Sequence, residues 1–508
     1  MTNGEWGARL RAGWERHPLP VVLGLAAALR LVAAFLSRGY GMHDDHFLVV
    51  EVAQRWAEGR WDLSDEMVAM RSLVYPWLHA GLFRAMDRLG LSDPQGKMLA
   101  VRLLHAAWSL LTVFAGYRAA LALSGERAAR QAGLLLAAFW VMPFMSVRNL
   151  IEVVSQPLLA LAALLLVRRR RPEGGLPERG GDAFAAGLLL GLAFVFRFQN
   201  LVVPAAAFAV LLAMRRFSSA LLLALGTAVA AGLVQGGSDW LGFGSPFASV
   251  RAYLAYNADP AHVAGYPQGP WFQYLGTLAG VLVPPTSLLL LWGFARSFRR
   301  AAVVFWPTFA FLALHSAYPG KQERFLLPVL PLVLLLAAVG LFAPGPRPPF
   351  WERHRRLARG LWIWFWAVNA LLLALYTPTY SKRSRVESLS LLRQESGVTG
   401  VVWETGPSNE TPPPVFYLAR DVPVYLSWQG KPLEALRAEM ESSGRARPNR
   451  AVFLGDRDLE GRVARLEGVL GRLSLERTVA PSLVDDLLHR MNPRHNVNLT
   501  AFVYRAGG

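Results

Sequence analysis

Long apolar runs recur between residues 19 and 377 of this 508-residue chain, and they constrain its fold more than any other feature. A helix needs about 20 such residues to cross about 30 Å of hydrocarbon. Only 17% of the residues are charged, whereas a soluble domain carries about 25%. We predict an all-α polytopic membrane protein with eleven spans, at roughly residues 19–37, 99–123, 130–147, 150–167, 183–199, 200–214, 218–236, 272–293, 301–316, 325–343 and 360–377.

The net charge of +18 is carried mainly by basic residues in short loops, at residues 9–16, 125–130, 168–171, 215–216, 296–300 and 347–359. This is the bias that orients membrane helices, with Lys and Arg on the cytoplasmic side, and it argues against nucleic-acid binding. All of these loops fall on one side if Ser72–Leu89 is an amphipathic surface helix and not a twelfth span. The N-terminus is then cytoplasmic. The outer face receives residues 38–98, 148–149, 237–271, 319–324 and the chain after 376.

The last part of the chain has the composition of a soluble domain. Short apolar runs predict buried strands, and Leu459–Leu473 has helical periodicity; the runs begin at Val401, Val415, Pro423 and Ala451. We predict a transmembrane catalytic domain, residues 1–377, and a small extracytoplasmic α/β domain, residues 378–508. The chain has no cysteine, which excludes a disulfide, a thiolate metal site and a cysteine nucleophile.

Two adjacent carboxylates, Asp44 and Asp45, stand between His43 and His46 just after the first apolar run. The surrounding segment reads Gly41-Met-His-Asp-Asp-His-Phe-Leu-Val-Val-Glu51. A carboxylate pair at a membrane boundary is either part of an ordinary exposed loop or part of a reaction centre. The residues of this segment alone leave both alternatives open.

Further charges stand inside or at the ends of the apolar runs. Arg30, Arg197 and Glu152 are among them, and such charges usually face a bundle interior or snorkel to the interface. Arg148 and Glu152 are four residues apart, on one helical face, and could pair with each other.

The remaining outer segments also carry polar residues. Asp239 and Trp271 lie in the second long outer loop, where an aromatic residue can also be a plain interface anchor. Lys321, Glu323 and Arg324 stand between two spans. The two cations suit a phosphate or pyrophosphate anion, and the alternative is a helix-capping turn with a local ion pair.

These residues together suit one kind of chemistry. A carboxylate near the membrane boundary can act as general base on a hydroxyl group, while cations across a cleft hold a leaving phosphate and neutralise its charge. This division of labour fits glycosyl transfer from a lipid-phosphate sugar. The chain has no Gly-rich nucleotide loop, which argues against a nucleotide-sugar donor.

Several motifs resemble the polytopic mannosyltransferases of the GT-C class, specifically glycosyltransferase family twenty-two, which acts on GPI-anchor precursors and lipid-linked oligosaccharides. The run from His43 to Glu51 is similar to the family's Pro-Asp-Glu-aromatic run ending in Glu. Trp61-Asp62 and Met70-Arg71-Ser72-Leu-Val-Tyr75-Pro76 resemble its Trp-Glu and Arg-Ser-x-x-Tyr-Pro signatures. Arg148-Asn149-x-x-Glu152 is loosely similar to a third element, and Lys321-Gln-Glu323-Arg324-Phe-Leu resembles its His-Lys-Glu-x-Arg-Phe motif.

The resemblance implies an inverting enzyme that uses a polyprenyl-phosphate sugar donor, with Asp44 as general base. No cofactor is certain. Asp45 replaces the family's Glu and could be a metal ligand, an acceptor contact or support for Asp44, so a divalent cation stays open. The family's His before the Lys is Gly320 here. Glu51, Arg71 and Tyr75 would bind substrate with the residues of the other motifs.

The expected reaction moves a hexose, mannose by resemblance, to a lipid-linked or glycan acceptor on the extracytoplasmic face. Ala, Arg and Leu usage favours a bacterial inner-membrane member of the family. Two alternatives belong to other classes. A transporter or flippase would show pseudo-symmetric halves, and no internal repeat is visible. A non-catalytic subunit of an envelope glycan assembly complex would use residues 378–508 as a docking surface.

Overall fold

The computed structural model describes residues 13–167, 180–265, 267–345, 349–407, 411–493 and 496–507. Arg9, Arg11, the cluster at 168–171 and Arg347, which support the predicted topology, lie outside these residues. The chain forms two compact units. The first comprises residues 1–34, 53–84 and 101–377, and the second comprises residues 35–52, 85–100 and 378–508.

The predicted division at residues 377 and 378 stays a prediction, and the compact units divide the chain differently. Two segments from the first long loop, 35–52 and 85–100, belong to the same compact unit as the C-terminal residues. The segment that carries Asp44 and Asp45 therefore belongs to the second unit.

The first unit is helical, and each apolar run predicted as a span contains helix. Its helices are α2 (Pro18–Leu36), α4 (Glu66–Ala69), most of α5 (Val74–Arg88) and of α6 (Pro94–Ser124), α7 (Glu126–Ala138), α8 (Val141–Ser146), α9 (Ile151–Val167), α10 (Gly180–Phe196), η1 (Phe198–Leu201), α11 (Val202–Ala213), α12 (Phe217–Ala230), the π-helix η2 (Ala231–Gly236), α13 (Gly237–Phe243), α14 (Ala248–Ala258), α15 (Pro260–Ala264), α16 (Gln273–Val281), α17 (Thr286–Arg296), α18 (Ala302–Ala317), η3 (Glu323–Leu326), α19 (Leu330–Leu341), α20 (Pro349–Arg353) and α21 (Arg355–Tyr376).

Four stretches of helix among the described residues are long and apolar enough to cross a membrane: α2, α6, Phe217–Phe243 and α21. A fifth span is formed if α16 and α17 are counted together, although they are bent by 116°. The predicted span at 272–293 is therefore broken into two helices, and whether the pair crosses as one span stays a prediction. Pro284 and Pro285 stand between the two helices, and proline lacks the N–H that a continuous helix requires.

Five shorter apolar helices accompany these stretches, over Ile151–Val167, Gly181–Phe196, Phe198–Ala213, Ala302–Ala317 and Leu330–Leu341. The total of eleven spans stays a prediction. Helix α5, over the predicted surface segment, holds His79, Arg84 and Asp87 and is not among the long apolar helices described here.

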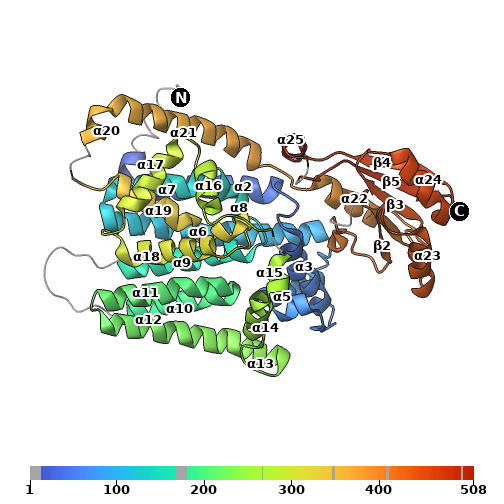
Figure 1. Cartoon of the computed structure of the whole chain (residues 1–508), viewed down its shortest axis with the longest axis horizontal. Helices are drawn as coiled ribbons and strands as arrows, with labels where there is room; N and C mark the ends of the chain where they lie inside the picture. Colours follow the sequence, from blue (N-terminus) through green and yellow to red (C-terminus); the bar gives the residue numbers. More distant parts are fainter. Residues whose placement is uncertain are drawn as a thin grey trace. The chain divides into compact units, whose positions relative to one another are not determined.

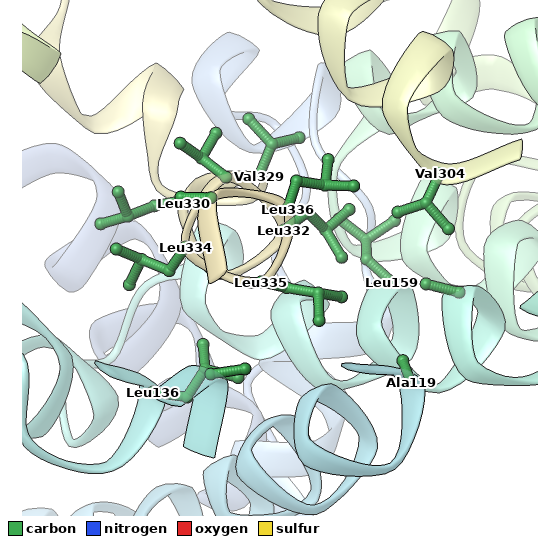
Figure 2. Packing of buried hydrophobic residues seen from close by; sticks show 14 of the residues in the cluster. Ala119, Leu136, Leu159, Val304, Val329, Leu330, Leu332, Leu334, Leu335 and Leu336 are labelled. Carbon is green, nitrogen blue, oxygen red and sulfur yellow. The ribbon is translucent and has the colours of Figure 1, made fainter. Parts of the chain in front are cut away.

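The core of the first unit surrounds α19, which is apolar on every side. Leu330, Leu332, Leu334, Leu335 and Leu336 are all at least 97% buried. Figure 2 shows them pointing outward from α19 toward neighbouring helices, including Leu136 of α7, Leu159 of α9 and Val304 of α18. A helix that is hydrophobic all round must be enclosed by others, so α19 is the centre on which the first unit packs.

The second unit contains a five-stranded sheet with the order β2-β1-β3-β5-β4. The strands are β1 (Val401–Glu404), β2 (Val424–Ser427), β3 (Arg450–Leu454), β4 (Leu473–Val479) and β5 (Ala501–Ala506). Strand β1 pairs in parallel with β2 and β3, whereas β5 pairs antiparallel with β3 and β4. The helices are most of α3 (His43–Ala57), α22 (Arg383–Gln394), α23 (Leu433–Ser442), α24 (Leu459–Leu470) and α25 (Leu483–Met491). The predicted small α/β fold is confirmed (Figure 1).

One predicted strand is wrong. Val415–Tyr417 forms the 3-10 helix η4, closed by hydrogen bonds from the N–H of Tyr417 to Pro414 O at 3.0 Å and of Leu418 to Val415 O at 2.9 Å. The three prolines before it lack N–H donors, so the chain here cannot join a sheet ladder as a central strand.

Candidate active site

The two aspartates differ in exposure. Both lie in the first turn of α3, which begins at His43, and a helix N-terminus stabilises negative charge. The Asp44 side chain is exposed, whereas Asp45 is only 8% exposed. Of the pair, Asp44 is the carboxylate more accessible to solvent.

An aromatic cluster holds the start of α3. The ring of Phe47 lies 4.8 Å from Tyr40, 4.5 Å from His43 and 4.8 Å from His46, centroid to centroid. Tyr417 of η4 contacts Phe47 edge-on at 6.2 Å. Such aromatic pairs stabilise by about 0.5–1.5 kcal/mol beyond the area they bury. The C-terminal residues therefore fix the turn on which Asp44 stands.

Lys382 adds a second attachment to the same segment. Its ammonium group donates a hydrogen bond to Gly41 O and lies 4.4 Å from the centre of the Tyr40 ring. Its backbone N–H donates to the Asp485 carboxylate at 2.7 Å. A cation over an aromatic ring is stabilising by about 0.5–2 kcal/mol, so Lys382 links residues 40–41 to helix α25.

The backbone just before Asp44 pairs directly with the C-terminal unit. Gly39 and Ser381 form a parallel bridge, in which the N–H of Ser381 donates to Arg38 O at 3.1 Å. Gly39 has φ +78°, and a Cβ on it would lie 1.8 Å from Ser381 O. Only glycine fits this position.

Glu51, predicted as a substrate contact, bonds within the second unit. Its carboxylate accepts a hydrogen bond from the N–H of Phe416 at 3.2 Å. This contact ties the middle of α3 to η4. Glu51 therefore has a structural partner, and its predicted role in substrate binding stays a prediction.

The pKa of His43 is lowered from 6.5 to about 4, chiefly by burial; the charge of Asp44 acts in the opposite direction, and those of Lys382 and Arg385 add to the lowering. The imidazole is consequently neutral near pH 7 and carries no positive charge beside the Asp44 carboxylate. The neutral ring packs against Phe47, which accounts for its desolvation.

The first unit contains the second group of predicted site residues, centred on Glu152. This carboxylate is fully buried; it accepts a hydrogen bond from Arg197 and lies 3.8 Å from Nε of Arg324. The possible pairing of Glu152 with Arg148 stays a prediction. Arg148 stacks on Phe144 at 4.4 Å, and Arg197, at the end of α10, reaches Glu152 from across the bundle.

Arg197 is a site candidate whose partner the sequence did not reveal. Its guanidinium lies 4.8 Å from the Phe325 ring centre, and among the described residues its Nε and Nη2 have no hydrogen-bond acceptor. The sequence did show a single arginine within an apolar run. Such an arginine usually has a buried partner, but the run does not show which residue the partner is.

A hydrogen-bonded chain runs beside this pair. The Tyr75 hydroxyl donates to Asn149 Oδ1 at 2.5 Å and lies 3.0 Å from His105 Nε2. His105 Nδ1 in turn lies 2.9 Å from Arg148 O. Burial and the charge of Glu152 raise the pKa of Tyr75 well above its usual value, so its hydroxyl stays a neutral donor. The structure thus brings Tyr75 together with the Arg148–Glu152 element, and the predicted role of these residues in substrate binding stays a prediction.

Lys321 has a different environment from that expected of a phosphate ligand. The residue is only 3% exposed, and its ammonium donates to the carbonyl oxygens of His315 at 3.0 Å, Ser316 at 2.7 Å and Tyr318. An ammonium has three protons, and all three are used. Lys321 caps the end of α18, and its predicted contact with a phosphate stays a prediction.

The other predicted contacts lie in the first unit with different surroundings. Arg324 bonds to Gln322 Oε1 at 2.6 Å, while Glu323 is exposed and Arg71 is half-buried ahead of α5. Trp271 is 70% exposed.

Asp239 is held by hydrogen bonds within the first unit. Its carboxylate is fully buried and accepts hydrogen bonds from Ser249 N–H at 2.9 Å, Ser249 Oγ at 2.7 Å and Gln235 Nε2 at 2.9 Å. These bonds tie α13 to α14.

The predicted residues thus form two groups. Asp44 and Asp45 belong to the second unit, and Arg148, Glu152 and Arg324 belong to the first. Their expected meeting across a cleft stays a prediction. Within the described ranges, no three His, Asp or Glu side chains gather as a metal-binding cluster.

A family model of Alg9-like mannosyltransferases matches residues 21–399. The chain belongs to this family. As an Alg9-like mannosyltransferase it is an integral membrane glycosyltransferase, so the predicted family and enzyme class are confirmed. The match extends beyond the region of about 30–330 that the motifs covered.

This Alg9-like protein is 24% identical over 421 residues to GPI mannosyltransferase 3 of Yarrowia lipolytica, covering 81% of this chain and 78% of the relative. ArnT from Cupriavidus metallidurans, solved with undecaprenyl phosphate, is similar in fold, with a TM-score of 0.59, 15% identity and coverage of 95% and 97% of the two chains. The archaeal oligosaccharyltransferase AglB from Archaeoglobus fulgidus, solved with an inhibitory peptide and a dolichol-phosphate, has a TM-score of 0.52, 11% identity and coverage of 90% and 72%. These likenesses confirm the GT-C-like fold.

Proposed function

We propose that this enzyme transfers a hexose, mannose by family, from a polyprenyl-phosphate sugar to a lipid-linked or glycan acceptor on the extracytoplasmic face. The observation that carries the proposal is the exposed Asp44 beside the buried Asp45 at the start of α3, in a chain of the mannosyltransferase family. The undecaprenyl phosphate bound to ArnT and the dolichol-phosphate bound to AglB support the class of donor.

The proposed reaction is a single displacement. Asp44 removes the proton from an acceptor hydroxyl, and the acceptor oxygen attacks the anomeric carbon of the sugar as its bond to the phosphate oxygen breaks. The new bond forms on the face opposite to the leaving group, so the configuration inverts. The polyprenyl phosphate leaves with the bonding electrons, and Asp44 later gives its proton to water.

Cationic side chains of the first unit would receive the leaving phosphate. Arg197 and Arg324 both lie near Oε1 of Glu152, and Nε and Nη2 of Arg197 have no acceptor among the described residues. Guanidinium groups bind phosphate oxygens with paired hydrogen bonds. We assign Lys321 to support of this segment, because its ammonium caps α18.

A donor comparison tests the proposed function. The purified protein is incubated with a membrane lipid extract and either radiolabelled polyprenyl-phosphate mannose or radiolabelled GDP-mannose. We expect transfer of label from the lipid donor alone, with the opposite anomeric configuration in the product. Transfer from GDP-mannose without the lipid, or retention of configuration, would contradict the proposal. The bacterial origin and the outward orientation of the C-terminus belong to the same proposal.

A further inference from the structure

A cavity of about 640 Å³ lies in the first unit where α17 and α19 end and α7 and α21 begin. Figure 1 shows these helices grouped at one end of the bundle. Six arginines line the cavity, and no acidic residue does; we call it the arginine pocket, lined by Arg127, Arg296, Arg299, Arg300, Arg355 and Arg359. None of these residues takes part in the proposed reaction.

The six guanidinium groups have no carboxylate partners among the described residues. Arg127 lies over Phe342 at 5.4 Å and Arg296 over Trp292 at 4.7 Å, while Arg300 donates a long bond to Leu123 O at 3.4 Å. Like charges held around one hollow repel each other. A bound anion with several acceptor oxygens would relieve this repulsion through charge-assisted hydrogen bonds.

The rest of the lining is aromatic and apolar. Trp292 and Trp351 lie 6.0 Å apart, and Phe342 and Trp362 lie 5.7 Å apart, centroid to centroid. Tryptophan is typical of the level at which lipid headgroups sit. The helices that carry these rings also expose large apolar side chains, including Leu288 at 67% and Ile363 at 64% exposed. Such a surface can face acyl chains.

The wall formed by α17 and α19 is rigid. A Cβ on Gly340 would lie 1.9 Å from the carbonyl oxygen of Gly293, so the two helices touch backbone to backbone. Close contact of this kind lets little movement occur between them. The pocket therefore has one closely packed wall, while the arginine side chains around it, Arg300 apart, are exposed.

We propose that the arginine pocket binds the headgroup of an anionic phospholipid, with its phosphate among the arginines and its acyl chains along the exposed apolar surface of α17 and α21. A soluble anion would use the arginines but not the tryptophans and the neighbouring apolar surface. The volume falls within the range of about 300–1,000 Å³ that small-molecule pockets have. On the predicted topology the pocket opens toward the cytoplasmic side, where basic pockets between helices meet anionic lipids.

The test compares two double variants of the full-length protein in a non-ionic detergent. Arg355→Gln/Arg359→Gln removes two lining charges, and Arg353→Gln/Arg356→Gln removes two neighbouring exposed charges that do not line the pocket. Calorimetric titration measures the Kd for dioctanoyl phosphatidylglycerol, dioctanoyl phosphatidylcholine and glycerol 3-phosphate. We expect the pocket variant to bind phosphatidylglycerol about thirtyfold more weakly than wild type, equivalent to about 2 kcal/mol. The control variant should change by less than about threefold.

The wild type should bind phosphatidylcholine and glycerol 3-phosphate at least about tenfold more weakly than phosphatidylglycerol, since each lacks either the net charge or the acyl chains. Equal weakening in both double variants would show general charge attraction and overturn the proposal, as would unchanged binding in the pocket variant. Equal affinity for glycerol 3-phosphate would assign the pocket to a soluble anion. If the double variant does not fold, Arg359→Gln alone should weaken binding about fivefold.

Discussion

At the scale of single residues, the burial of Glu152 carries a free-energy cost in the first unit. An ion removed from water costs several kcal/mol, and this carboxylate is fully buried with Arg197 at 4% exposure. The ion pair offsets the cost only while both partners are present, because removing one leaves the other buried and unpaired. Glu152 and Arg197 should therefore behave as one unit.

Glu152→Ala is expected to lower the free energy of unfolding by about 3–5 kcal/mol. The double variant Glu152→Leu/Arg197→Met should recover part of this loss, because it removes the orphaned charge as well. Thermal unfolding in detergent measures both effects. Glu58→Ala, which breaks the exposed pair with Arg60, is the control and should change stability little. Additive losses in the double variant would contradict the pairing.

The buried His43 makes stability depend on pH. Its pKa is about 4 in the folded chain and 6.5 in the unfolded chain, so between these values the unfolded chain binds more protons. The contribution to stability is complete above pH 6.5 and is lost as pH falls toward 4. Unfolding measured from pH 7 to pH 4 should show a shallower fall for His43→Gln than for wild type. An equal fall of the free energy of unfolding with pH in His43→Gln and wild type would contradict the lowered pKa of His43.

At the scale of elements, the C-terminal sheet domain acts as a scaffold for the start of α3. Strand-like pairing of Gly39 with Ser381, the Lys382 contacts and the Glu51 bond to η4 all attach residues 39–51 to residues after 378. A general base is effective only when its position is fixed within hydrogen-bond reach of the proton. The domain would then serve the reaction by positioning Asp44, without contacting substrate itself.

Lys382→Met should lower kcat by about tenfold or more with little change in the donor KM, because it loosens the turn that carries Asp44 without removing a donor contact. Lys382→Arg, which keeps the charge over Tyr40, should restore part of the rate. Arg445→Met removes an exposed ion pair of the same unit and should leave kcat unchanged. A rise in KM alone would assign Lys382 to donor binding.

At the scale of the whole molecule, apolar runs predicted the helices well, because burial and span length are local properties of the sequence. Contacts between residues that are distant in the sequence were harder to predict. Nothing in the sequence near Glu152 indicates that Arg197, 45 residues away, is its partner. The attachment of residues 39–51 to the C-terminal unit is likewise a contact between distant segments, and Pro412–Pro414 converted an apolar run into η4.

The predicted topology can be tested directly because the protein has no native cysteine. Single cysteines are introduced as Ser442→Cys in the C-terminal unit and Arg299→Cys between α17 and α18, both at exposed positions. A membrane-impermeant maleimide should label position 442 when applied from the extracytoplasmic side of sealed membranes, and position 299 only after permeabilisation. The reverse pattern would overturn the assignment of the reaction to the outer face.

The assignment of Asp44 is tested by the single-turnover rate of mannose transfer from polyprenyl-phosphate mannose. Asp44→Asn and Asp45→Asn are compared with wild type, and folding is verified by equal unfolding midpoints. We expect Asp44→Asn to lose about a hundredfold to ten-thousandfold in rate with an unchanged donor Kd, and Asp45→Asn to lose less. A rate for Asp44→Asn within about threefold of wild type would contradict its role as general base.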